Sequence, residues 1–219
     1  MDFKVLAVGD VVGEPGLDRI RRSLRYWKKQ TGADFVIVNG ENASGVGITP
    51  QQAEDILDAG ADVITLGNHS FNRREIVSYL DDCPQILRPA NYAPQTPGRG
   101  WAVFDSKCGP VAVIDLIGRC GMDFGPDNPF LLVEKILKEA EPYIKDKGLT
   151  VVDGVIGLTF VGVKLSNGRC HFVYLMRGSL PSGDMIFPYG QQMIGMDAWE
   201  VAQWALTGAE DLQRSLGVA

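Results

Sequence analysis

The sequence of 219 residues contains few of the side chains that bind metals through nitrogen or sulfur. Histidine occurs twice, as His69 and His171, and the four cysteines show no C-x-x-C spacing. Zinc sites of the common cysteine and histidine kinds are therefore not indicated. A chain of this length can bury a core without disulfide bonds, so we expect the cysteines to be reduced.

Long apolar runs and an excess of positive charge are also absent. No apolar run approaches the ~20 residues of a membrane span, and the one near the N-terminus is too short for a signal peptide. With 21 Lys and Arg against 27 Asp and Glu, the net charge of -6 does not indicate membrane binding or general nucleic-acid binding. We expect a cytoplasmic protein with small-molecule partners, and whether it forms a homo-oligomer stays open.

The common nucleotide-binding motifs are missing as well. Gly9, Gly13 and Gly16 are spaced G-x-x-x-G-x-x-G rather than G-x-G-x-x-G, and no G-x-x-x-x-G-K-[ST] motif occurs. A dinucleotide site or a P-loop is therefore disfavoured.

The first part of the chain alternates short apolar strands with amphipathic helices. Alternation of this kind predicts βαβ units, and hence an α/β fold with a largely parallel sheet and flanking helices. One predicted helix has a basic face, which we interpret as solvated rather than anion-binding. The predicted strands are 3–8, 35–38, 63–66 and 85–87, and the predicted helices are 17–30, 50–59 and 73–80.

The pattern changes in the second part of the chain. Asn167-Gly168 between two β-rich runs is a strong hairpin signal, and a Gly/Pro-rich loop is expected at 178–195. We predict two units: an incomplete domain over 1–140 and a small α+β unit, a β-hairpin plus a helix, over 148–219. The expected elements are a hairpin of 101–104 with 111–116, a helix at 130–144, a hairpin of 155–165 with 170–176, and a helix at 197–206.

Polar side chains follow three successive predicted strands. Asp10 comes after the first, Glu41 and Asn42 after the second, and Asn68 and His69 after the third. Because parallel strands end side by side at the ligand-binding edge of an open sheet, these side chains should converge. Any one of the clusters alone is more often a turn than a ligand site, but their recurrence at three strand ends favours a functional site.

The residue types in these clusters suit one particular chemistry. Carboxylate and amide oxygens are the ligands that Mn²⁺, Mg²⁺ or Fe²⁺ prefer, and a carboxylate between two ions can bridge them. Two such ions could hold a phosphoryl group and generate the attacking hydroxide. His69 could then protonate the leaving oxygen.

A set of motifs in this region resembles the YmdB-like calcineurin-type metallophosphoesterases over about residues 1–140. That resemblance implies a dinuclear metal site and the hydrolysis of phosphodiesters, including 2′,3′-cyclic nucleotides. It also implies that Asp10, Glu41, Asn42 and Asn68 are metal ligands and that His69 is the catalytic acid. The motifs are Gly9-Asp10-Val11-Val12-Gly13, Asn39-Gly40-Glu41-Asn42-Ala43, Gly67-Asn68-His69, Arg88-Pro89-Ala90-Asn91 and Asp127-Asn128-Pro129-Phe130.

The histidine ligands that this family takes from the second half of its fold have no counterpart here. Residues 148–219 resemble instead the enolase-N-terminal-like domain of the heavy-metal-chelation family, through segments such as Leu180-Pro181-Ser182-Gly183 and Trp199 to Leu206. We therefore expect an impaired phosphodiesterase that binds divalent metal weakly or as one ion. Two alternatives stay open: a module that binds a metal or a small ligand, and a nonfunctional chimera or fragment.

Overall fold

The first part of the chain forms a parallel sheet, as predicted. The computed structural model describes residues 4–107, 109–119, 125–144, 149–155, 159–164, 170–180 and 183–188, the last four ranges by their backbone. The four strands pair in the order β1-β2-β3-β4, and every pairing is parallel. Their bounds are β1 (Val5–Val8), β2 (Phe35–Asn39), β3 (Val63–Thr65) and β4 (Ile86–Leu87).

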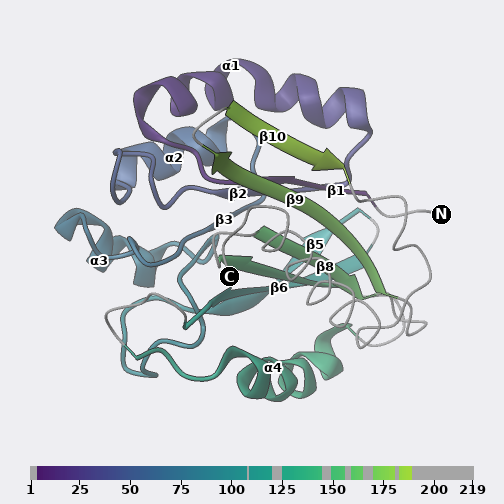
Figure 1. Ribbon diagram of the computed structural model, residues 1–219. Helices are drawn as coiled ribbons and strands as arrows, with labels where there is room; N and C mark the ends of the chain where they lie inside the picture. Colours follow the sequence, from purple (N-terminus) through teal and green to yellow (C-terminus); the bar gives the residue numbers. More distant parts are fainter. Residues whose placement is uncertain are drawn as a thin grey trace.

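Three helices connect these strands and cover one face of the sheet (Figure 1). The second helix begins with a capping box, because the Thr49 hydroxyl accepts from Gln52 N while Gln52 Oε1 accepts from Thr49 N. The first helix begins at Gly13, ahead of the predicted start at residue 17. The helices are α1 (Gly13–Thr31), α2 (Pro50–Asp58) and α3 (Arg74–Asp82).

The basic face of α1 is paired with acidic side chains. Arg21 contacts Glu14 and, across the helix pair, Asp55. Lys28 lies 2.9 Å from the carboxylate of Asp62. Because carboxylates already neutralise these cations, the structure favours a solvated face over an anion-binding patch.

A second sheet continues from residue 101 to residue 188. Its strand order is β10-β9-β8-β7-β6-β5, with β6 and β7 parallel and the other neighbours antiparallel. Both predicted hairpins occur, β5 with β6 and β8 with β9, and the predicted helix at 197–206 lies outside the described residues. The strands are β5 (Trp101–Ser106), β6 (Gly109–Ile117), β7 (Leu149–Val155), β8 (Thr159–Lys164), β9 (Cys170–Leu180) and β10 (Gly183–Pro188).

Two predictions about this sheet were wrong. The single strand expected at 155–165 is the end of β7 followed by β8, and the loop expected at 178–195 contains the end of β9 and all of β10. Glycine and proline suggested a loop, yet Gly178 pairs with Met185 within the ladder, and Pro188 is tolerated at the end of an edge strand. The strands from β7 onward extend the sheet that β5 and β6 begin, and the division into 1–140 and 148–219 stays a prediction.

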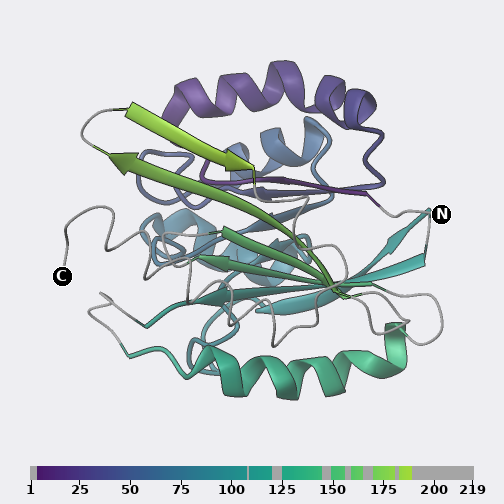
Figure 2. The same ribbon diagram turned by 45° about the vertical axis from the view of Figure 1, so that its right-hand side comes forward.

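The two sheets pack face to face, with helices on both outer sides (Figure 2). Alternation along β2 sets this arrangement, because Phe35 and Ile37 face the second sheet while Val36 and Val38 face α1 and α2. On the second sheet, Val111 completes the core between the sheets. The first sheet therefore has side chains packed on both faces, which explains why its strands are apolar up to their carboxyl ends, where Asn39 and Thr65 lie.

The remaining helix, α4 (Pro129–Ile144), covers the outer face of the second sheet (Figure 1). Ile114 and Leu116 of β6 pack against Ile136 of this helix. Asn128 caps the helix, because its Oδ1 accepts from Phe130 N at 3.0 Å. Among the described residues, no helix is long and apolar enough to cross a membrane.

Buried polar side chains fasten the two sheets together near the carboxyl ends of β3 and β6. Asp115 is fully buried, and its Oδ2 accepts from Leu66 N at 3.0 Å. Asn91 is also fully buried: its Nδ2 donates to Ile117 O and to Asp127 O, and its Oδ1 accepts from Ile117 N. Asn91 therefore ties the segment after β4 to the end of β6 and to the loop before α4.

We predict that Asn91→Ala lowers the free energy of unfolding by about 3 kcal/mol, because it leaves buried backbone groups without hydrogen-bond partners. Urea denaturation followed by circular dichroism measures the change. Asn72→Ala, at an exposed position, is the matched control and should unfold like the unaltered chain. Equal stability of the two variants would contradict this account of Asn91.

Candidate functional site

The segments that follow β1, β2 and β3 lie side by side, as the parallel sheet requires. Val11 N donates to Asn39 O at 3.0 Å, and Gly13 N donates to Asn42 O at 2.8 Å. Gly40 N donates to Thr65 O at 3.0 Å, which joins the second segment to the third strand. The backbone thus brings the three predicted polar clusters to one edge.

Asp10 adopts an unusual backbone conformation at this edge. Its φ is 39°, and among the described residues other than glycine it alone has a positive φ. This left-handed conformation is uncommon and costs energy, although Asp tolerates it better than most residues. The exposed carboxylate accepts from Asn42 Nδ2 at 2.7 Å, so the first and second clusters are in contact.

Asn42 also contacts His69, which joins the second cluster to the third. Asn42 Oδ1 lies 2.6 Å from His69 Nδ1. Because the amide nitrogen of Asn42 faces the carboxylate of Asp10, its oxygen must face the imidazole, and Nδ1 must then be the donor. This assignment leaves Nε2 of His69 as the nitrogen available for proton transfer.

Glu41 is the buried carboxylate of the site. It is 5% exposed, and its Oε2 accepts from His69 N at 3.2 Å. Gly67 packs directly against it, so that a Cβ at position 67 would overlap the carboxylate. The turn after β3 can approach Glu41 only because residue 67 is glycine.

The carbonyl of Gly67 is held by two hydroxyl groups that the sequence did not reveal. Tyr92 Oη donates to Gly67 O at 2.9 Å, and Ser70 Oγ donates to the same oxygen at 2.6 Å. Burial raises the pKa of Tyr92, so its hydroxyl remains a donor. Asn68 is half-buried in the same turn. One feature of the sequence points to Tyr92: this residue directly follows the motif that ends at Asn91.

An arginine holds the loop that follows Glu41 and Asn42. Arg73 Nη2 donates to Ser44 O at 3.0 Å, and Arg73 Nε donates to Val46 O at 3.1 Å. These bonds attach the loop after β2 to the start of α3. The Arg73 bonds therefore fix the second and third clusters relative to each other, in addition to the contact between Asn42 and His69.

The donor set fits a divalent cation of the oxygen-preferring kind. Asp10 and Glu41 supply carboxylates, and Asn42 Oδ1 has a second lone pair that it can offer beside its contact with His69. Within the described part of the chain, no three His, Cys, Asp or Glu side chains converge closely enough to hold a metal ion. A cation at this edge would therefore need amide oxygens as ligands.

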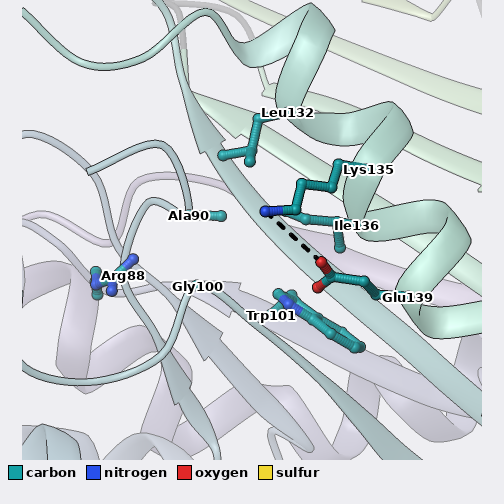
Figure 3. Close-up of a pocket in the computed structure, with 8 residues that line it drawn as sticks. All are labelled: Arg88, Ala90, Gly100, Trp101, Leu132, Lys135, Ile136 and Glu139. Atoms are coloured by element: carbon teal, nitrogen blue, oxygen red, sulfur yellow. Dashed lines mark ion pairs between the residues drawn. The ribbon is translucent and has the colours of Figure 1, made fainter. Parts of the chain in front are cut away.

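A pocket of about 200 Å³ lies elsewhere in the molecule, between α4 and the strands below it (Figure 3). Lys135 and Glu139 of α4 point toward it and form an ion pair at 3.9 Å, while Trp101 closes it from the sheet. Burial lowers the pKa of Arg88, which also lines the pocket. None of the five predicted site residues contributes to its lining.

Two known protein families match this chain, and together they cover both of its parts. The model of the family described as "YmdB-like protein" matches residues 6–155. The chain belongs to the YmdB-like family. A second family model, described as "Putative heavy-metal chelation", matches residues 137–219. Both resemblances found in the sequence are thereby confirmed.

Individual relatives agree with the family match. The YmdB-like chain is 40% identical over 148 residues to the 2′,3′-cyclic-nucleotide 2′-phosphodiesterase of Bacillus subtilis, a match that covers 65% of this chain and 55% of that protein. It is 32% identical over 158 residues to a "Putative phosphatase/phosphodiesterase" of Mycoplasma pneumoniae, covering 69% of this chain and 54% of that protein. This chain spans about half the length of the curated relatives it matches.

Solved structures confirm the α/β fold. A crystal structure described as a novel phosphatase of Mycoplasma pneumoniae matches with a TM-score of 0.61 and 27% identity, covering 69% of this chain and 54% of that chain. A hypothetical protein of Thermus thermophilus matches with a TM-score of 0.59 and 31% identity, covering 69% of this chain and 57% of that chain. The parallel sheet with its flanking helices is therefore the arrangement shared with these relatives.

We predict that Gly67→Ala displaces the carboxylate of Glu41 and destabilises the protein by about 1–3 kcal/mol, because the added methyl group overfills a packed site. Thermal unfolding measures the stability, and a crystal structure of the variant shows the displacement. Gly125→Ala is the matched control, because a Cβ there meets nothing within 4 Å. The prediction is wrong if both variants unfold at the same temperature.

Proposed function

We propose that this YmdB-like chain is a metal-dependent phosphodiesterase. The observation that carries the proposal is the direct contact of Asp10, Asn42, His69 and Glu41 at the carboxyl ends of three parallel strands. Membership of the YmdB-like family and the phosphodiesterase name of the Bacillus subtilis relative support the same reading.

In this proposal, Asp10, Glu41, Asn42 and Asn68 hold the divalent metal. Their oxygen atoms suit Mn²⁺, Fe²⁺ or Mg²⁺. Such an ion, when bound, neutralises phosphoryl charge and supplies hydroxide near neutral pH. Burial of Glu41 supports a ligand role, because a buried carboxylate is stabilised by a cation beside it.

His69 is the proposed general acid. Its contact with Asn42 fixes the ring, so that in the imidazolium form Nε2 carries the proton that passes to the leaving oxygen of the phosphodiester, while Nδ1 keeps its own. A general acid of this kind contributes typically ~10² to 10⁴-fold to the rate. Asn42 would therefore serve both as a ligand and as the group that orients the imidazole.

The proposed substrates are small phosphodiesters, including 2′,3′-cyclic nucleotides. The name of the Bacillus subtilis relative supports this class, and the net charge of -6 argues against a long polyanionic substrate. We also propose slow turnover and weak metal binding. Apart from His69 the chain has one further histidine, which is too few for the ligands that the family takes from its second half.

A second candidate function rests on the match of residues 137–219 to the heavy-metal-chelation family. In this alternative, that segment binds a metal or a small ligand and the YmdB-like part is a scaffold. Metal content separates the two candidates. If the chain is a phosphodiesterase, the purified protein should contain Mn or Fe that is lost in the Asp10→Ala variant. If the chain is a binding module, its metal content should be the same in the Asp10→Ala variant.

Purified protein in excess Mn²⁺, assayed with a chromogenic phosphodiester and with 2′,3′-cyclic AMP, tests the proposed reaction. We predict turnover below ~1 s⁻¹, which is slow for an enzyme. Asp10→Ala should abolish it, and His69→Ala should lower it ~10² to 10⁴-fold. Asp105→Ala, at an exposed position on β5, and His171→Ala are the matched controls and should retain the activity.

Two results would contradict this proposal. Activity that survives both Asp10→Ala and His69→Ala would place the reaction elsewhere. Turnover of ~1 s⁻¹ or more that both substitutions abolish would confirm the site but disprove the impairment.

A further inference from the structure

We propose that Tyr92 is a positioning residue, whose hydroxyl holds the Gly67–His69 turn against Glu41. The inference rests on the proposed function, because it concerns how the proposed metal ligands and general acid are held. Tyr92 bonds the backbone of this turn. It acts through the carbonyl of Gly67, at 2.9 Å from its hydroxyl.

The hydroxyl of Tyr92 is held in a restricted environment. Its ring lies 6.0 Å from that of Phe71, which limits its movement on the side of the turn. Ser70 donates to the same carbonyl through Oγ at 2.6 Å and through its backbone N at 3.1 Å, so Gly67 O accepts from three donors. A carbonyl that accepts from several donors in fixed directions cannot rotate without weakening at least one of these bonds.

The other end of the Tyr92 contact is anchored in the second sheet. Asn91, the preceding residue, is fully buried and exchanges hydrogen bonds with Ile117 at 2.7 and 2.9 Å. Its Nδ2 also donates to Asp127 O at 2.9 Å. Tyr92 therefore connects the turn after β3 to the end of β6 and to the loop before α4.

The turn has little tolerance for displacement on its other side. Gly67 is packed against the carboxylate of Glu41, and His69 N donates to that carboxylate at 3.2 Å. A movement of the turn would change the position of Asn68, His69 and Glu41 together. Removal of a group that orients metal ligands in this way typically lowers the metal affinity ~10- to 100-fold.

Tyr92→Phe removes the hydroxyl and keeps the ring. Tyr79→Phe is the matched control, because the Tyr79 hydroxyl bonds Glu54 Oε1 at 3.4 Å and joins α3 to α2. The imidazole resonances of metal-free protein give a first readout, and the two histidines are assigned with His171→Ala. We expect Tyr92→Phe to shift the His69 resonances and Tyr79→Phe to leave them unchanged.

Calorimetric titration with Mn²⁺ gives the second readout. We expect Tyr92→Phe to weaken the Asp10-dependent affinity ~10-fold and Tyr79→Phe to leave it unchanged. Ser70→Ala removes the other hydroxyl donor to the same carbonyl and keeps the backbone donor of residue 70, so it provides an independent variant if Tyr92→Phe does not fold. It should shift the His69 resonances in the same way.

The two readouts separate this inference from the proposed function. If the unaltered protein shows no Asp10-dependent Mn²⁺ binding, the proposed metal site fails, while a His69 shift in metal-free Tyr92→Phe still supports the positioning role. If folded Tyr92→Phe and Ser70→Ala both leave the His69 resonances in place, the positioning role of Tyr92 is wrong. A thermal midpoint equal to that of the Tyr79→Phe variant excludes general destabilisation as the cause of any shift.

Discussion

The burial of the Glu41 carboxylate is the constraint on which the site depends. A carboxylate that is 5% exposed loses most of its hydration and needs polar neighbours. His69 N provides one of them, and Gly67 permits the close approach that this bond requires. The turn after β3 is thus folded around Glu41, and the conformation of this turn sets the positions of the Asn68 and His69 side chains.

Strand β6 of the second sheet supports the site from behind. Val111 packs on the first sheet, and Asp115, which lies on the same face of β6, bonds Leu66 N at the end of β3. Asn91 fastens the segment after β4 to the same end of β6. The edge that holds the predicted ligands is therefore built by one sheet and braced by the other, so substitutions in β6 should affect the site at a distance.

The alternation of strands and helices, and the convergence of Asp10, Asn42 and His69, could be predicted because parallel strands end at a common edge. The bracing contacts could not, because they join residues distant in sequence, as Tyr92 joins Gly67. The strand β10 was missed because glycine and proline indicate loops locally, whereas its pairing with β9 depends on the whole sheet. Sequence patterns thus reveal the strand ends but not the buried polar contacts behind them.

The proposed cation site is the edge formed by Asp10, Glu41, Asn42 and Asn68, beside His69. Paramagnetic broadening by Mn²⁺ tests it directly, because the chain has two histidines whose imidazole resonances can be followed separately. Substoichiometric Mn²⁺ should broaden the His69 resonances first, and Asp10→Ala should remove the effect. Broadening of His171 while His69 stays sharp would place the metal in the C-terminal segment and contradict the account.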